Sequence, residues 1–284
     1  MIKGLAITPP VLGRIAIGKV VEKNGKRLPE KDDAFTITTQ VQQQGEWMLH
    51  PLHLQLQQQQ GTQKLRSIPV TLLFNDPDLN LRADYSAFDK TTGRPLCVGN
   101  GESAKRMTPE GPQSVICPGP HLCAFGQEAR CKPYGRLNVQ IEGQEDPLAS
   151  FIFRTTGFNS IRTLAARLSY WNALSHGSAK YLPLSLKLRA KSTTQSHRAP
   201  IYYVDLTLRE GADVEETLEQ AVHQGKQHIY NDHALEAAAK LGFGNGILEE
   251  TEEETEAVLE EFFPEAEAVS SSRNLTGGGI RSTS

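Results

Sequence analysis

The sequence predicts an α+β fold with a mostly antiparallel sheet and one or two packed helices. Two observations support this class. Short segments rich in β-branched residues, which are typical of strands, recur along most of the 284 residues. Between them lie a few segments whose apolar residues recur at the three- and four-residue steps of an amphipathic helix. The strands and helices follow one another in mixed order, which favours α+β over the other classes.

The first half of the chain contains three predicted strands and a glutamine-rich connection. Residues 11–21 and 34–41 are typical of strands, and the Asn24-Gly25 step between them is typical of a hairpin turn. Two glutamine-rich patches follow, QVQQQGEW and LQLQQQQG, which form either a polar strand pair or a solvated loop. The segment SIPVTLLFNDPDLNL then predicts a strand that ends in a turn at Asn75-Asp76-Pro77.

The second half contains four further predicted strands and the clearest helix. The strands are RLNVQIEG, LASFIFRTTG, LPLSLKLRAKSTT and IYYVDLTL. A helix is predicted over FNSIRTLAARLSYWNAL, with Asn159 or Ser160 as its cap. Asp213 and Glu216 have the spacing of a capping box, so DVEETLEQAVHQ is predicted to be a second helix, followed by a short one in DHALEAAAKLG. The apolar stripe of the clearest helix consists of Ile161, Leu164, Leu168 and Trp171.

The composition divides the chain into one domain and a tail. Hydrophobic residues make up 38% of the chain and aromatic residues 7%, which indicates that part of its length lies outside any core. From Glu249 to Glu267 there are ten glutamates and no basic residue, a composition typical of disordered segments. We therefore expect residues 1–242 to form the α+β domain and residues 243–284 to form an acidic, low-complexity, disordered tail.

The chain contains no apolar run long enough to span a membrane and no signal-peptide pattern at its N-terminus. The expected location is therefore the cytoplasm. In that reducing compartment, clustered cysteines are more often metal ligands than disulfides.

All four cysteines lie within residues 86–136, a stretch that carries 6 of the 16 prolines, many glycines and little periodicity. Their spacing is Cys97-x19-Cys117-x5-Cys123-x7-Cys131. Four thiolates match the tetrahedral coordination of a structural Zn²⁺ ion, and glycines and prolines allow the sharp turns of a metal loop. We predict a four-cysteine zinc loop over about residues 90–136, ordered by the bound ion rather than by a core.

Other interpretations of the cysteines stay open. The four thiols could be free, two of them could form a disulfide, or they could hold an iron–sulfur cluster. His121 could replace one sulfur. The remaining histidines are expected at the surface. His223, His228 and His233 are spaced by five residues and cannot share one helix face, and His50-x2-His53 lies just before a glutamine-rich run.

A second feature is a one-sided basic stretch. From Arg154 to Arg198 there are eight basic residues and no acidic one, although the chain as a whole has a net charge of −3. Such a face favours an anionic partner, and DNA or RNA is the commonest large anion in a cytoplasm. We further hypothesise that the acidic tail occupies this face and weakens DNA binding. The predicted nucleic-acid contacts are Arg130, Lys132, Arg136, Arg162, Arg167, Lys187, Arg189 and Lys191.

The sequence predicts no enzyme, because it lacks a G-x-S-x-G elbow, a P-loop and an H-E-x-x-H motif. One alternative is a metal-dependent hydrolase or nuclease that uses Asp76, Asp78, Asp84 and Asp89 together with nearby histidines, although these aspartates are also typical of turns. Another is a single-stranded DNA-binding protein that stacks bases on Tyr134, Tyr170 and Trp171. No membrane partner and no small-molecule substrate are evident.

Several motifs occur in a characteristic order: KDDAFTITT after the first strand, IPVTLLFNDPDLNL, PLCVGNG with the first cysteine, CPGPHLCAFGQEARCKPYGRL with the other three, and TTGFNSIRTLAARL at a strand-to-helix step. This order resembles the recombination-directionality-factor-like proteins of phages and integrative mobile elements. The resemblance spans about residues 1–210, and its cysteine-rich part is the most specific. The acidic tail has no counterpart in the family.

The resemblance implies a non-catalytic cytoplasmic protein that binds a serine integrase, a site-specific DNA recombinase, and switches it from integration to excision. It also implies that Cys97, Cys117, Cys123 and Cys131 are zinc ligands of a scaffold. The glutamine-rich insert and the C-terminal extension depart from the smaller family members. We therefore interpret the chain more broadly, as a DNA recombination accessory protein of a phage or mobile element that binds a recombinase or another recombination enzyme, DNA, or both.

Overall fold

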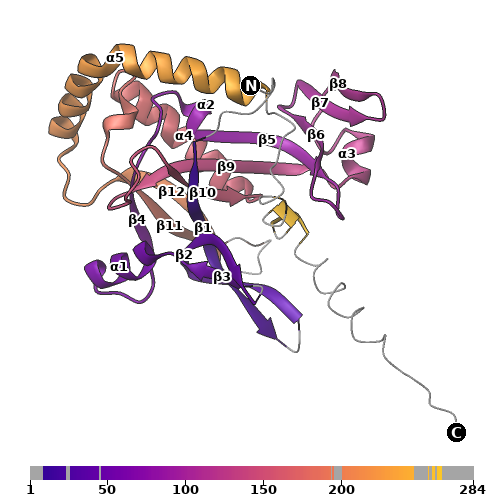
Figure 1. Cartoon of the computed structure of the whole chain (residues 1–284), viewed down its shortest axis with the longest axis horizontal. Helices are drawn as coiled ribbons and strands as arrows, with labels where there is room; N and C mark the ends of the chain where they lie inside the picture. Colours follow the sequence, from indigo (N-terminus) through magenta and orange to yellow (C-terminus); the bar gives the residue numbers. More distant parts are fainter. Residues whose placement is uncertain are drawn as a thin grey trace, which may run out of the picture.

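The computed structural model describes residues 9–23, 26–44, 46–192, 194, 200–245, 255, 258, 259 and 261–263. Over these residues the fold is α+β, with a large, mostly antiparallel open sheet and five α-helices (Figure 1). The strands are β1 (Val11–Lys23), β2 (Lys26–Gln43), β3 (Glu46–Leu49), β4 (Ser67–Thr71), β5 (Leu81–Phe88), β6 (Pro95–Gly99), β7 (Ser103–Thr108), β8 (Gly111–Ile116), β9 (Lys132–Ile141), β10 (Ser150–Thr155), β11 (Leu184–Ser192) and β12 (Pro200–Leu208). The helices are α1 (Pro51–Gln60), α2 (Pro77–Asn80), α3 (Ala124–Glu128), α4 (Phe158–Leu174), the 3-10 turn η1 (Ala179–Tyr181) and α5 (Val214–Asn245).

The sheet branches at β9. Nine strands follow the order β3-β2-β1-β10-β9-β5-β6-β7-β8, and β4, β11 and β12 leave this path at β9. The first six residues of β9 pair with β5, its middle pairs with β10, and Gln140 and Ile141 pair with Thr71 and Val70 of β4. Among the pairings of the described strands, the parallel one joins β1 to β10. β9 therefore carries the connection between the two parts of the sheet.

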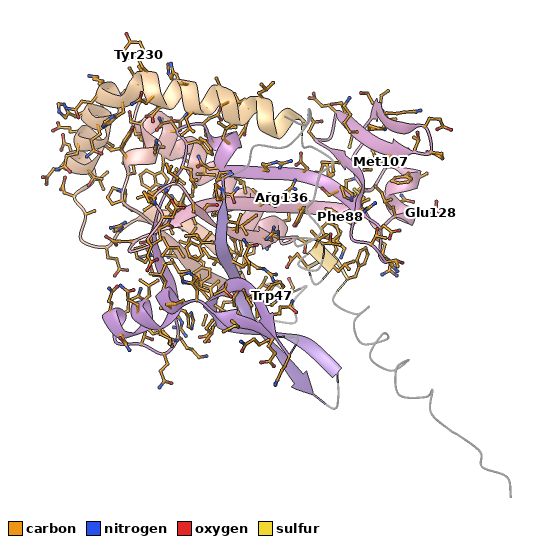
Figure 2. The ribbon with its side chains drawn as sticks, in the orientation of Figure 1. Trp47, Phe88, Met107, Glu128, Arg136 and Tyr230 are labelled. Carbon is orange, nitrogen blue, oxygen red and sulfur yellow. The ribbon has the colours of Figure 1, made fainter. Side chains whose placement is uncertain are left out.

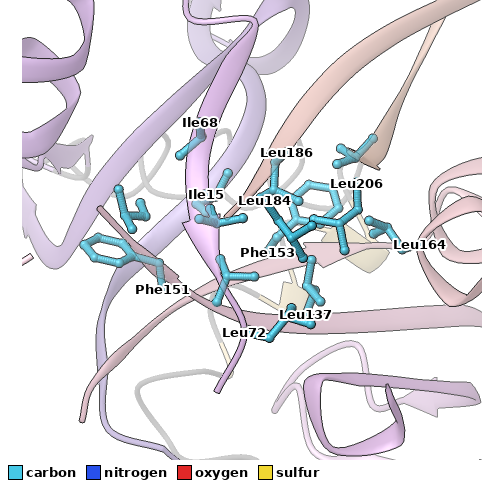
Figure 3. Packing of buried hydrophobic residues seen from close by; sticks show 14 of the residues in the cluster. Ile15, Ile68, Leu72, Leu137, Phe151, Phe153, Leu164, Leu184, Leu186 and Leu206 are labelled. Carbon is cyan, nitrogen blue, oxygen red and sulfur yellow. The ribbon is translucent and has the colours of Figure 1, made fainter. Parts of the chain in front are cut away.

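The main core lies where these two parts meet. Alternate residues of each strand point inward, as the two-residue period of a strand requires. Figure 3 shows Phe151 and Phe153 of β10 together with Leu184 and Leu186 of β11 and Leu164 of α4. Helix α4 packs over β12: the indole nitrogen of Trp171 donates to the Leu206 carbonyl at 3.1 Å, and the Ser160 hydroxyl accepts from the Val204 amide at 3.1 Å.

Helix α5 is attached to the domain by a buried acidic residue. The Asp232 carboxylate accepts hydrogen bonds from Tyr181 (2.7 Å) and Lys180 (2.9 Å) of η1 and from Asn75 (3.3 Å). One turn further along, Glu236 accepts from the amides of Asn75 and Asp76. The opposite side of α5 faces outward, where Tyr230 projects away from the domain (Figure 2).

Most predicted strands and the clearest helix are confirmed. β1 and β2 form the predicted hairpin, since Lys23 pairs with Lys26 on either side of the turn residues, which lie outside the described ones. The Asp213 carboxylate accepts from the Glu216 amide at 2.9 Å at the start of α5, as a capping box requires. The first glutamine-rich patch is part of the β2–β3 strand pair.

Four local predictions are wrong. The second glutamine-rich patch is helix α1, which begins with the His50 side chain accepting from the Leu52 amide and ends at Gly61. Residues 86–136 are not irregular, since they contain the β6–β7–β8 meander and α3. The two helices predicted after residue 213 are one, and α4 is capped at Gly157, not at Asn159 or Ser160, because Ser160 bonds to β12 instead. The described helices also outnumber the one or two expected.

The predicted acidic tail lies mostly outside the described residues. Its first residues, 243–245, belong to the end of α5. Its described residues further on include Val258, Phe262 and Phe263, which are buried. This part of the tail is therefore packed, in contrast to the disorder expected from its composition.

The packing of α4 on the core can be tested with a matched pair of leucines. Leu164 is fully buried, so Leu164→Ala is expected to lower the free energy of unfolding by about 2–5 kcal/mol through lost burial and a residual cavity. Leu174 ends the same helix and is half exposed, so Leu174→Ala is expected to cost less than about 1 kcal/mol. Urea denaturation of both variants measures the difference, and equal costs would contradict this packing.

Candidate metal centre and charged surfaces

The four cysteines come from four separate elements and line one small cavity. Cys97 lies on β6, Cys117 follows β8, Cys123 is the N-cap of α3, and Cys131 directly precedes β9. The antiparallel meander places the end of β8 near β6, and the turn through α3 returns the chain to the same point. The cavity has a volume of about 20 Å³, enough for a single water-sized particle. Arg106 and Phe125 also line it.

Two glycines permit the close approach of these elements. A Cβ atom on Gly99 would lie 2.9 Å from the Cys117 sulfur, and a Cβ atom on Gly126 would lie 3.2 Å from the Cβ atoms of Cys123 and Cys131. The Gly126 amide also donates to the Cys123 sulfur at 3.3 Å, and its carbonyl accepts from the Cys131 amide at 2.7 Å. Larger residues at these positions would push the cysteine-bearing segments apart.

The thiols influence one another electrostatically. Burial, together with the neighbouring charges of Cys97, Cys117 and Cys123, raises the pKa of Cys131 to about 11. Burial also raises the pKa of Cys97, against the hydrogen bond and the charge of Arg106, which lower it. The Arg106 guanidinium lies 4.2 Å from the centre of the Phe125 ring and 3.6 Å from the Cys123 sulfur. A cation thus already faces the cluster.

The donor set suits zinc, because four sulfurs around a single-ion cavity are the ligands that a closed structural site uses. Within the described part of the chain, no group of three or more His, Cys, Asp or Glu side chains is arranged closely enough to hold a metal ion. The sulfurs therefore share a cavity without the closed geometry of a tetrahedral site. His121 is exposed and does not line this cavity; its carbonyl accepts from the Gln127 side chain.

The other histidines have structural contacts. His50 caps α1, His53 is buried and accepts from the Ile37 amide, and burial lowers the pKa of both rings. On α5, His228 stacks on Tyr181 with ring centres 6.0 Å apart. His53 is thus not at the surface as expected, because it packs in the core, whereas His223, His228 and His233 are exposed as predicted. None of these histidines lines the cysteine cavity.

The predicted basic strand forms as expected, but acidic partners accompany it. Lys187, Arg189 and Lys191 alternate along β11. Arg189 shares the buried carboxylate of Asp205 on β12 with Arg167 of α4, at 3.1 and 2.8 Å. Lys187 pairs with Glu210 at 2.6 Å, and Lys191 donates to the Asn159 side chain. Much of the charge of this face is therefore balanced within the protein.

The remaining predicted contacts lie elsewhere and differ in exposure. Arg130 and Arg162 are exposed, whereas Lys132 is half-buried. Arg136 is 6% exposed and lies 3.6 Å from Asp84, inside the molecule in Figure 2. Arg136 is therefore too buried to be a surface contact for DNA.

Of the three aromatic residues considered for base stacking, only Tyr170 is exposed. Tyr134 is fully buried, and Trp171 packs against the core with its indole nitrogen bonded to β12. This arrangement gives no support to a stacking platform.

The four aspartates considered for a nuclease centre do not converge. Asp76 caps α2 and pairs with Lys240 at 2.7 Å, and Asp78 lies in the first turn of the same short helix. Asp84 lies beside Arg136 on the sheet. Asp89 accepts from the amides of Thr91 and Thr92 in a turn, and these hydrogen bonds lower its pKa. They organise turns and strand contacts in separate places.

Sequence reasoning missed three important residues. Arg106 faces the cysteine cavity from β7, and nothing in the spacing of the cysteines identified it. Asp205 was visible as a charged residue inside the apolar strand IYYVDLTL, a pattern that indicates a buried ion pair. Phe262 and Phe263 stand together in a run of glutamates. Two adjacent aromatic residues are unusual in a fully solvated segment, so this pair could have indicated that part of the tail is packed.

The comparisons with known proteins agree with the motifs. A family model described as Gp3-like, recombination directionality factor-like, matches residues 12–209. This match covers more than half of the chain and includes all four cysteines, β1 to β12 nearly in full, and α4. The class is thus that of recombination directionality factor-like proteins, and the chain belongs to the Gp3-like family. No curated protein and no solved structure matches the chain. Over the described residues, no helix is long and apolar enough to cross a membrane.

The shared Asp205 carboxylate gives a pH-dependent prediction. Burial opposes its ionisation, but the hydrogen bonds and charge of Arg167, the Leu206 amide and Arg189 outweigh burial, so the pKa of Asp205 lies below its usual value. Its contribution to stability is therefore fully present above the unfolded-state pKa of about 3.9 and is lost as the pH falls through the lower folded-state pKa. Asp205→Asn is expected to lower the free energy of unfolding by about 1–3 kcal/mol at neutral pH, and the difference should shrink in acid.

Urea denaturation over a pH series measures this difference. The matched control is Glu210→Gln, whose carboxylate is exposed and pairs with Lys187 on the same strand face. Because exposed ion pairs contribute little, Glu210→Gln should have only a small effect on the free energy of unfolding at every pH. A cost of Asp205→Asn that does not depend on pH would contradict the ion-pair role of Asp205.

Proposed function

We propose that the protein is a non-catalytic, zinc-stabilised recombination accessory protein of a phage or mobile element that binds a recombination enzyme. The observation that carries the proposal is the convergence of four cysteines, from β6, β8, α3 and β9, on one cavity within the part of the chain that matches the family. Its place of action would be the cytoplasm, where the DNA of such an element is recombined.

The zinc part of the proposal rests on donor chemistry. Cys97, Cys117, Cys123 and Cys131 would hold the ion, which would supply positive charge and a fixed tetrahedral link between the meander and β9. The raised pKa values of Cys97 and Cys131 oppose ionisation in the metal-free protein, so zinc would bind with release of protons. An ion held by all four thiolates would have no open coordination position for chemistry.

The charged surfaces favour a protein over DNA as the main ligand. Arg167 and Arg189 share Asp205, and Lys187 is paired with Glu210, so these three basic residues already have partners within the protein. Phosphate contacts would have to replace these pairs, which reduces the net gain from DNA binding. DNA contact through the exposed Arg130 and Arg162 would be secondary, within the complex with the recombination enzyme.

The metal is tested by elemental analysis of the purified full chain. We expect about one zinc ion per chain, and we expect Cys117→Ser and Cys131→Ser each to reduce this content and lower the melting temperature, because three thiolates hold zinc less well than four. His121→Ala is the matched control and should retain both the metal and the melting temperature. Absence of metal from the wild-type chain, or iron with inorganic sulfide in its place, would contradict the proposal.

The partner is tested by capture of the serine recombinase encoded by the same mobile element, co-expressed with the full chain. Ile116 and Leu122 directly precede Cys117 and Cys123, and both side chains are at least 80% exposed. Apolar side chains this exposed are typical of contact surfaces. Leu122 does not line the cysteine cavity, so we expect Leu122→Asp to keep the zinc and the melting temperature but to lower recombinase affinity about tenfold or more.

The control for this test is Tyr230→Asp on the outer side of α5, an equally exposed position that should have no effect on capture. Failure of the wild-type chain to bind the recombinase or to alter the ratio of excision to integration would contradict the accessory role. So would metal-dependent DNA cleavage that Asp84→Ala abolishes, since that result would make the protein a nuclease.

A further inference from the structure

Part of the acidic C-terminal segment packs against aromatic residues at the ends of β5 and β9, and we call the site that it fills the aromatic pocket. Phe88 is the last residue of β5, and Tyr134 lies near the start of β9. In Figure 1 the short yellow piece of the C-terminal segment lies beside these two strands, and Figure 2 shows Phe88 at this position. We call the described residues of this segment the C-terminal anchor; they are Thr255, Val258, Leu259, Glu261, Phe262 and Phe263.

The centre of the contact is Phe262, which is 1% exposed. Its ring centre lies 4.6 Å from that of Phe88 and 5.1 Å from that of Tyr134, both in edge-to-face orientation. The rings of Phe88 and Tyr134 are themselves 5.5 Å apart. This geometry is the favourable one for aromatic pairs, so Phe262 completes a three-ring cluster.

Polar contacts fix the position of the anchor. The Lys132 ammonium donates to the Phe262 carbonyl at 2.8 Å. One Glu261 carboxylate oxygen accepts from both the amide (2.7 Å) and the hydroxyl (3.0 Å) of Thr156. Thr156 lies just before the N-terminus of α4, where the helix dipole favours a negative charge. The pocket thus binds an acidic residue that is directly followed by an aromatic one.

The anchor also has a defined backbone shape. The Phe263 amide donates to the Leu259 carbonyl at 2.8 Å, a four-residue step that makes a helical turn. The turn of Gly93 passes so close that a Cβ atom there would overlap the Thr255 side chain. Lys90 places its ammonium 5.7 Å from the centre of the Phe263 ring. Shape, charge and aromatic character are therefore all recognised.

The pocket and its cover differ in origin. Phe88, Lys132, Tyr134 and Thr156 lie within residues 12–209, the part that matches the family, whereas the anchor lies outside it. Tyr134 and Phe88 are 0% and 2% exposed, and Val258, Phe262 and Phe263 of the anchor belong to the same buried cluster. An aromatic surface of this kind is rarely left in water. The family domain therefore carries a pocket whose occupant comes from outside that domain.

We propose that this pocket is a peptide-binding site whose ligand is a helical turn of a partner protein with an acidic residue directly before two aromatic residues. The C-terminal anchor has this chemistry and occupies the pocket in cis. A tethered ligand acts at an effective concentration of about a millimolar, so a partner segment binds only when it displaces the anchor. The inference rests on the described contacts and does not depend on zinc or on a recombinase partner.

The test uses the full chain and a fluorescent peptide of residues 252–266. The variant Phe262→Ala with Phe263→Ala empties the pocket, so we expect it to bind the peptide at least about a hundredfold more tightly than the wild-type chain does. The same peptide with Glu261→Ala and Phe262→Ala should fail to bind. The matched control chain, Tyr230→Ala, removes an exposed aromatic ring and should behave as the wild type.

A second measurement does not depend on the fold of a variant. A fluorine label on the Phe262 ring of the otherwise wild-type chain should report a buried ring, and excess unlabelled peptide should shift its resonance to that of an exposed ring. Equal binding of the wild-type and substituted peptides, or an unchanged fluorine resonance at saturating peptide, would overturn the proposal. A wild-type dimer that exchanges anchors between two copies would also overturn it, because the ligand would then be a second copy of this chain.

Discussion

The structure depends on the placement of one strand, β9. It pairs with β10, β5 and β4, so both parts of the sheet are positioned by its backbone, and its inward residues Leu137, Val139 and Ile141 belong to the main core. β9 begins one residue after Cys131. Whatever fixes that cysteine therefore fixes the start of the strand on which the sheet branches. The same strand supplies Tyr134 to the aromatic pocket and Lys132 to its polar rim.

The spacing of apolar residues was sufficient to predict the amphipathic elements, which have one buried face and one solvent-exposed face. β11 and α4 are of this kind, because their apolar residues follow a regular two-residue or 3.6-residue spacing. The meander β6–β7–β8 was not predicted, since its short strands carry few apolar residues of their own. They are ordered by pairing in succession, β6 with β5, β7 with β6 and β8 with β7. Helix α1 was hidden for a similar reason: only Leu52, His53 and Leu56 are buried, and its other positions are mostly glutamine.

The cysteines of the candidate site could be predicted from the sequence, but the residues around them could not. The spacing of the cysteines identified the residues that now line one cavity, because clustered cysteines in a loop-rich segment have few other uses. It could not reveal Arg106, which reaches the cavity from a neighbouring strand. In the same way, counting charges identified the basic residues of β11 and α4 but not the carboxylate of Asp205 on β12, which Arg189 of β11 shares with Arg167 of α4. Partners that are distant in sequence become visible only when strand pairing is known.

The two features proposed to carry function lie at the same end of the molecule, joined by β9. The cysteine cavity closes just before this strand, and the aromatic pocket opens on its first residues. Cys131 of the cysteine cavity therefore lies only three residues before Tyr134 of the aromatic pocket, so metal or peptide binding at one site would occur close to the other. This proximity makes the junction of the meander with the main sheet the part of the molecule where a partner would have most influence on its surroundings.

The parallel pairing of β1 with β10 has a consequence for how the chain reaches its native state. Val11 pairs with Ser150, so the N-terminal hairpin must wait for more than a hundred residues to emerge from the ribosome before its neighbour exists. Until then the inner edge of β1 is an unpaired edge strand, open to unwanted association with other chains. Long-range pairings of this kind slow folding, because the entropy of closing a large loop is lost before the stabilising contacts form. During synthesis, the hairpin's dependence on a late strand makes the early nascent chain the vulnerable stage in the life of this protein.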